Sequence, residues 1–148
     1  MNNNILLDEL PQYTNSGLKI RTDFRESIKF ELLMQDHNLS EEVKIMQALQ
    51  LYYYDISKIT DVRQAVQDIL WFYRCGKIIE NSNKEDYEER QEDAKQIYSY
   101  EFDDEYIFSA FMEQYGIDLN EIEYMHWWKF KSLFNSLNEN TQFVKIMG

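Results

Sequence analysis

Several ingredients of common folds are scarce in this 148-residue sequence, and each scarcity narrows the choice of structure. A single cysteine, Cys75, excludes an intrachain disulfide and is typical of a protein kept in a reducing cytoplasm. Four glycines and one proline are too few for a turn-rich all-β fold. No apolar run approaches the ~18 residues of a membrane span, and the polar start Met1–Asn4 does not resemble a secretion signal. We therefore expect a mainly α protein with no membrane partner.

Basic residues are scarce as well, since 15 lysines and arginines stand against 27 acidic residues, for a formal net charge of −12. Most of the surplus lies in residues 80–105. Neutralising phosphates requires a basic surface, so we expect no nucleic-acid partner. An acidic surface suits basic protein partners or serves solubility.

Length and hydrophobic patterning predict one helical domain over residues 1–148, built as a bundle of five to six helices. In residues 1–21, a short apolar run, a turn-forming Asn15–Gly17 and alternation at Leu18–Arg21 predict a small N-terminal β-hairpin. Residues 23–79 form the first helical half and residues 97–148 the second. Residues 80–96 contain almost no apolar side chain, and we expect them to form an acidic mobile loop.

Capping residues and apolar spacing set the expected helices. Caps at Thr22 or Asp23, at Ser40 and near Thr60–Asp61 begin three helices, and the third ends at Gly76 in a left-handed cap. Further helices are expected over about 103–115 and 120–137, with a short one from about 140. The residues expected to face the core in the first three helices are Phe24, Ile28 and Leu32, then Val43, Met46, Leu49 and Tyr53, then Val62, Val66, Ile69 and Tyr73.

Candidate catalytic and metal-binding groups are few. Glu123 and His126 have the i, i+3 spacing of a di-iron motif, but such a site needs two of these motifs, and the other histidine, His37, lies between helices. A catalytic Cys75 would need a histidine base, and the chain has only two histidines. Cys75 also lies at the end of a helix, where a thiolate is disfavoured. Acidic runs such as Asp103–Glu105 lie on solvated segments, whereas acid–base catalysis needs a carboxyl held in an apolar pocket. We therefore expect no enzymatic activity, no metal and no cofactor.

Aromatic residues make up 16% of the chain and occur in runs such as Tyr52–Tyr54, Trp71–Tyr73 and Trp127–Trp128. Neighbours on a helix point about 100° apart, so one buried face cannot cover every member of a run. Most of these rings are expected in the core, and at least one exposed aromatic patch is expected to bind another copy or a partner helix. The candidate partner-binding residues are Trp71, Tyr73, Trp127, Trp128, Phe130 and Lys131.

Five blocks follow one another along the chain: Thr22–Arg25 with Ile28–Glu31, Ile69–Gly76, Gln114–Leu119, His126–Lys131 with Leu133–Phe134, and Phe143–Met147. In this combination the chain, from about Leu10 to Gly148, resembles the bacteriophage gene-product-fifteen family of long-tailed phages of Gram-positive bacteria. The resemblance implies a non-catalytic tail assembly chaperone in the host bacterial cytoplasm. Such a chaperone would bind the tape-measure protein and help recruit tail-tube subunits. Association of the chain with copies of itself is a further expectation. Relatives usually continue past the position of Gly148 with a more basic segment, so the resemblance implies that this chain is a truncated form, a short variant or the short product of a frameshifted pair.

The alternative is an acidic interaction protein, such as a nucleic-acid mimic that inhibits a host enzyme. Mimicry needs carboxylates spread over a rigid surface at phosphate-like spacing, whereas the acids here bunch in the segment expected to be mobile. A chaperone for a long amphipathic helix needs exposed apolar surface together with surplus charge. The composition provides both, which favours the chaperone.

Overall fold

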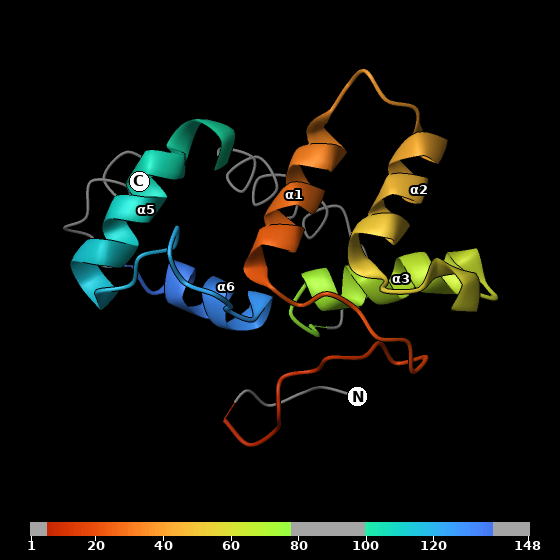
Figure 1. Ribbon diagram of the computed structural model, residues 1–148, viewed down its shortest axis with the longest axis horizontal. Coiled ribbons are helices and arrows are strands. Elements are labelled where there is room, and N and C mark those ends of the chain that lie inside the picture. The colour runs from red at the N-terminus through yellow and green to blue at the C-terminus, as the bar shows by residue number, and fades with distance from the viewer. Residues whose placement is uncertain (1–5, 78–99, 138–148) are drawn as a thin grey trace, which may run out of the picture. The chain divides into compact units, whose positions relative to one another are not determined.

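The computed structural model describes residues 6–77 and 100–137, with the backbone alone for residues 100–103. These ranges contain five α-helices and no strand, which confirms the mainly α class. No helix within them is both long and apolar enough to cross a membrane. The acidic loop expected at 80–96 and the short helix expected from about 140 lie outside the described residues. Figure 1 labels the helices α1 (Phe24–Gln35), α2 (Glu41–Tyr52), α3 (Val62–Tyr73), α5 (Tyr100–Tyr115) and α6 (Trp127–Asn135), and a 3-10 turn, η1, spans Ile56–Lys58.

The chain divides into two compact units. The first comprises Met1–Ile79 and the short segment His126–Trp128, and the second comprises Glu80–Met125 and Lys129–Gly148. In the first unit α1 and α2 pack against each other as a helical hairpin, and α3 packs against α2, crossing below it in the view of Figure 1. In the second unit α5 meets α6, where the rings of Phe111 and Phe130 stack with centroids 5.1 Å apart. That residues 1–148 form one domain remains a prediction.

The first three helices begin where their capping residues predict. The Asp23 carboxylate accepts a hydrogen bond from the Arg25 N–H, and the Ser40 hydroxyl accepts one from the Val43 N–H. The Asp61 carboxylate accepts a hydrogen bond from the Gln64 N–H at the start of α3. Each cap satisfies one of the N–H groups that the first helical turn leaves without a partner in the helix. A capping residue acts on its near neighbours in the sequence, so these residues correctly predicted where the three helices begin.

The buried faces of these helices differ from the predicted ones. Ile28 is only half-buried, and Leu32, Val43, Met46 and Val62 are exposed. Among the predicted core residues, Phe24, Leu49, Tyr53 and Ile69 are buried as expected, and Val66 and Tyr73 are half-buried. The residues buried within the helices are Phe24, Ser27, Phe30 and Glu31 on α1, then Lys44, Ala48, Leu49 and Tyr52 on α2, then Ala65, Asp68, Ile69 and Phe72 on α3. The helices are apolar on more than one side, so spacing alone could not choose the side that faces the core.

Polar groups fill part of this core because each finds a partner there. The Ser27 and Tyr52 hydroxyls lie 2.7 Å apart, and the Tyr73 hydroxyl donates to the Glu31 carboxylate at 2.6 Å. Burial is the main reason that the pKa of Tyr52 is raised far above its usual value, so this phenol stays neutral. Lys44 donates from Nζ to the Met34 carbonyl at 3.2 Å. Hydrogen bonding offsets the cost of desolvating these groups, and so the helices turn polar side chains inward.

The predicted N-terminal β-hairpin is wrong. Its turn forms, with Gly17 at φ +84°, but within residues 6–21, the part of this segment that the structure describes, a single pair, Tyr13 and Lys19, makes a β-bridge across it. Leu6 and Leu7, from the apolar run, are 88% and 83% exposed. The second arm pairs elsewhere: Ile20 forms a bridge with Tyr53, directly after α2.

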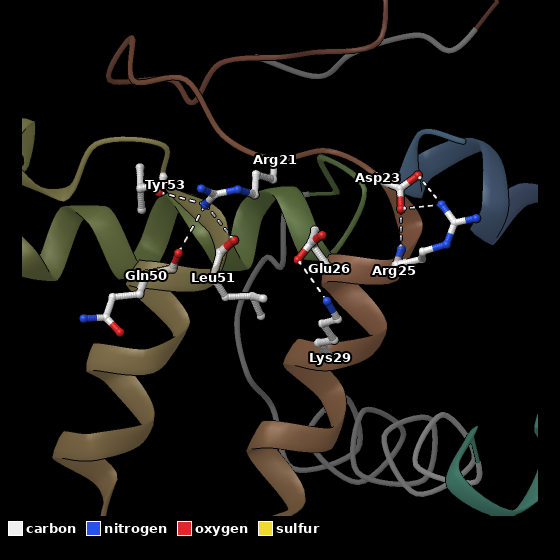
Figure 2. Close-up of polar contacts among 8 residues, drawn as sticks. All are labelled: Arg21, Asp23, Arg25, Glu26, Lys29, Gln50, Leu51 and Tyr53. Carbon is white, nitrogen blue, oxygen red and sulfur yellow. Dashed lines mark hydrogen bonds and ion pairs between the residues drawn. The ribbon is translucent and has the colours of Figure 1, made fainter. Parts of the chain in front are cut away.

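Arg21 explains why the second arm lies against α2. Its backbone N–H donates to the Tyr52 carbonyl at 2.7 Å, and its guanidinium donates to the carbonyls of Gln50, Leu51 and Tyr53 (Figure 2). The guanidinium also lies over the ring of Tyr54, 4.7 Å from the centroid. A cation at a helix C-terminus satisfies carbonyls that have no partner in the helix and complements the helix dipole. These contacts hold the arm at the end of α2.

The last described helix, α6, begins seven residues later than the predicted Asn120, at Trp127. Residues 116–126 are irregular: the Asp118 side chain accepts from the N–H groups of Asn120 and Glu121, and His126 makes a β-bridge with Asp23. The Trp127 N–H donates to the Thr22 carbonyl at 2.8 Å. The Trp127 N–H is thus bonded to a distant segment, whereas in a helix continuing from Asn120 it would donate to the carbonyl four residues earlier, that of Glu123.

Candidate functional site

The tryptophans predicted to bind partners, Trp127 and Trp128, lie inside the first unit, at 0% and 4% exposure. Their indole N–H groups donate to the last carbonyls of α3: Trp127 to Tyr73 at 2.8 Å and Trp128 to Phe72 at 2.8 Å. The last carbonyl groups of a helix receive no hydrogen bond from an N–H group of the same helix, and burying them without a donor is costly. Consecutive indoles from a distant segment therefore cap α3.

Ring contacts hold the same indoles in place. The Trp127 ring stacks on Tyr73 with centroids 5.8 Å apart, and the Trp128 ring stacks on Phe72 at 6.0 Å and meets the edge of Trp71 at 5.6 Å. Aromatic pairs in these geometries contribute about 0.5–1.5 kcal/mol each beyond the burial of their area. The structure brings these candidate residues together and gives Trp127 and Trp128 an internal role. Trp71 and Tyr73 are half-buried. Binding of a partner by these four residues remains a prediction.

The turn after α3 brings the backbone close to Trp128. The Cys75 N–H donates to the Phe72 carbonyl and the Gly76 N–H to the Trp71 carbonyl, the pattern of a Schellman cap. The left-handed conformation expected at Gly76 is present at φ +74°, and Cys75 before it is also left-handed, at φ +62°. A Cβ on Gly76 would lie 2.8 Å from Cη2 of Trp128. Glycine is therefore required at position 76 for both its φ and its lack of a side chain.

His126 fastens the start of α6 to the N-terminal segment. Its Nδ1 accepts from the Trp128 N–H at 3.0 Å, the position of a helix N-cap. Its Nε2, 2.9 Å from the Pro11 carbonyl oxygen, must then carry the proton and donate. Burial lowers the pKa of His126, and the bond to Pro11 opposes this in part. The neutral ring is the form that fits, because protonated Nδ1 would face the Trp128 N–H.

We expect the free energy of unfolding to fall as the pH drops below about 6.5, the ordinary pKa of a histidine. In this range the unfolded chain takes up a proton on His126 while the folded chain, with its lowered pKa, does not. The decrease is at most about 1.4 kcal/mol per pH unit for one group and stops once the folded ring is protonated. Urea titrations between pH 7.5 and 5.5 measure it. His126→Asn, which keeps a capping oxygen, should remove this dependence, whereas the exposed control His37→Asn should retain it.

The other candidate residues, Phe130 and Lys131, belong to the second unit. Phe130 is fully buried and stacks on Phe111 and, at 6.1 Å, on Phe134. Lys131 is half-buried, with Nζ over the Phe134 ring at 5.2 Å from the centroid. Phe130 thus joins α6 to α5 as a core residue. Its role in partner binding, and that of Lys131, remains a prediction.

The profile of a family described as Bacteriophage Gp15 protein matches residues 6–148. The chain belongs to this family. Comparison with curated proteins gave no match, and comparison with solved structures gave none either. Membership indicates a structural, tail-related role in a bacteriophage. The matched residues include both units of the molecule, so the role applies to the chain as a whole.

Exposed apolar side chains of this Gp15-family protein occur on both helices of the α1–α2 hairpin, and sequence reasoning had placed most of them in the core. Val43 and Met46, one turn apart on α2, are 40% and 53% exposed. Further exposed apolar residues are Ile45 on α2 and Leu32 and Met34 on α1. Ala48, Leu49 and Tyr52 form a second apolar stripe on α2, and this is the stripe that is buried. Its presence in the sequence was the one sign that Val43 and Met46 could face outward.

The residues considered for catalysis or metal binding are separated or engaged. Glu123 is exposed, while both ring nitrogens of His126, the other residue of the weighed i, i+3 motif, take part in hydrogen bonds. In the described parts of the chain, no group of three histidine, cysteine or acidic side chains is arranged to hold a metal ion. Cys75 is half-buried in the left-handed turn after α3. The geometry around these residues is explained by packing and capping.

Proposed function

We propose that this Gp15-family protein is a tail assembly chaperone, which acts by binding other proteins and not by catalysis. Its client would be the tape-measure protein, and it would help recruit tail-tube subunits in the host bacterial cytoplasm. The observation that carries the proposal is the exposed apolar surface of the α1–α2 hairpin, in a chain whose family indicates a tail-related role.

A long helical client must have its apolar stripe covered until assembly. An amphipathic helix binds to apolar helical surfaces through residues spaced one turn apart, as Val43 and Met46 are on α2. Methionine side chains, which Met34 and Met46 supply here, adapt to irregular partners. The surplus of acidic residues would keep the complex in solution.

Co-expression with a fragment of the same phage's tape-measure protein tests the proposal. We expect the fragment to stay in the soluble fraction and to elute together with the chaperone in size-exclusion chromatography. The double variant Val43→Gln and Met46→Gln should reduce the amount of complex about tenfold, because it removes apolar contact area while glutamine remains a good helix former. Both residues are exposed, so stability should change by no more than about 0.5 kcal/mol.

The matched control replaces Gln47 and Gln50, which are exposed on the same helix, with alanine. This control should bind as well as the wild type. If the fragment remains insoluble with the wild-type chain and no complex elutes, the chaperone proposal is wrong. Equal binding by the Val43/Met46 variant would instead show that the client binds elsewhere.

A further inference from the structure

Helix α5 of the second unit presents an apolar row to solvent on the side away from its packed face. Among its described side chains, those of residues 104–115, Ile107, Ala110 and Phe111 are buried, and Phe111 stacks on Phe130 of α6. On the exposed side, Phe108 and Met112 are 36% and 45% exposed. They are four residues apart, so they lie one above the other on the helix surface.

Carboxylates border this row. Asp104 continues the same i, i+4 row one turn before Phe108, and Glu105 and Glu113 form a second row beside it, with Ser109 between them. These residues are all exposed. No lysine or arginine occurs between Lys95 and Lys129, so α5 contains no cation to balance them. The result is a surface, here called the α5 stripe, with an apolar centre and an anionic border, formed by Asp104, Glu105, Phe108, Ser109, Met112 and Glu113.

The charge of the α5 stripe decides between possible occupants. A second copy of the chain, paired symmetrically, would bring carboxylates against carboxylates, and like charges repel. Nucleic acids and anionic lipid surfaces carry the same sign as the stripe. An amphipathic helix with lysines or arginines beside its apolar residues matches both the apolar centre and the border.

We propose that the α5 stripe is a docking site for a basic amphipathic helix. This proposal rests on the chaperone function above and names the chemistry of the client segment that this site would bind. Phe108 and Met112 would contact apolar side chains of the bound helix. The carboxylates of Asp104, Glu105 and Glu113 would pair with its lysines or arginines, which would make binding sensitive to salt.

Two synthetic amphipathic peptides of about 18 residues, roughly five helical turns, test the site. Both have the same leucine face, and their polar faces carry either lysine or glutamate. We expect the full chain to bind the lysine peptide and to bind the glutamate peptide at least about tenfold more weakly. Raising the salt concentration from about 50 to 500 mM should weaken the binding of the lysine peptide. Fluorescence anisotropy of labelled peptides measures both effects.

Matched variants distinguish the effect of the α5 stripe on peptide binding from the effect of the net charge of the protein. The variant Asp104→Asn, Glu105→Gln and Glu113→Gln should lose about tenfold in affinity for the lysine peptide together with most of the salt dependence. Met112→Gln should weaken binding and keep the salt dependence. The control Glu121→Gln and Glu123→Gln, which neutralises exposed acids of the same unit outside α5, should bind nearly as well as the wild type. Far-UV circular dichroism checks that each variant is folded.

Equal affinity for both peptides, no binding of the lysine peptide, or equal losses in the stripe and control variants would overturn the α5 proposal. Its failure can be told apart from failure of the chaperone function. If the tape-measure fragment stays insoluble while the lysine peptide binds as expected, the function is wrong and the site stands. If the fragment is kept soluble but neither it nor the peptide responds to the stripe variants, the site is wrong and the function stands.

Discussion

Replacing Gly76 with alanine should lower the free energy of unfolding by about 3 kcal/mol or more. Gly76 has φ +74°, where a side chain costs roughly 1–2 kcal/mol. The new Cβ would also lie 2.8 Å from Cη2 of Trp128. That indole cannot move away without losing its hydrogen bond to the Phe72 carbonyl and its contact with Trp71. Overpacking of this kind adds about 1–3 kcal/mol.

The other left-handed glycines are natural controls. Gly17 and Gly116 have φ +84° and +67°, and nothing lies within 4 Å of a Cβ built on either. Gly17→Ala and Gly116→Ala should therefore lower the free energy of unfolding only by the cost of placing a side chain on a left-handed backbone, about 1–2 kcal/mol. Urea unfolding followed by far-UV circular dichroism provides all three values. Combining Gly76→Ala with Trp128→Phe, which removes the benzene half of the indole, should recover part of the loss. Equal costs at the three glycines would show that the contact with Trp128 has no energetic effect.

Trp127→Ala should destabilise the protein by about 3–5 kcal/mol, the range for removing a fully buried large aromatic residue. The substitution removes the stacking on Tyr73 and leaves the Tyr73 carbonyl at the end of α3 without the indole donor. A typical domain is stable by only 5–15 kcal/mol, so much of the stability of the first unit would be lost. The midpoint of urea unfolding measures the change.

A conservative variant separates the parts of this effect. Trp127→Phe keeps a ring for stacking and removes the indole N–H, so it should cost less than the alanine variant, about 1–3 kcal/mol for the unsatisfied carbonyl plus lost volume. Trp71→Ala, at a half-buried indole, should cost less than Trp127→Ala. If Trp71→Ala were the more damaging change, the view of Trp127 as a cap of α3 would be wrong.

The helix starts and the buried faces were not equally predictable. Asp23, Ser40 and Asp61 each act on the N–H groups two or three residues ahead, so a local pattern is enough to locate these helices. The side of α2 that faces the core depends on partners elsewhere in the chain. Lys44 points inward toward the Met34 carbonyl, and Met46, an apolar residue at helical spacing, points out. Spacing within α2 contains no information about Met34.

The predicted site shows the same division. The aromatic runs marked Trp127 and Trp128 as candidates for binding a partner. The structure buries both, because the end of α3 offers their indole N–H groups carbonyl acceptors 54 and 56 residues away. The exposed rows on α2 and α5 consist of ordinary core-type residues, such as Met46 and Met112, so composition did not distinguish them. Only the packed structure shows which apolar side chains are left outside.

The sequence by itself determined the mainly α class, the starts of the first three helices, the acidic character and the family. These depend on composition, on hydrogen bonds between near neighbours, and on residue order. The tertiary structure decided where Arg21 binds, why α6 begins only at Trp127, and which apolar rows face solvent. Each of these depends on a backbone carbonyl or a ring brought close from a distant part of the chain, and such proximity exists only after the helices have packed.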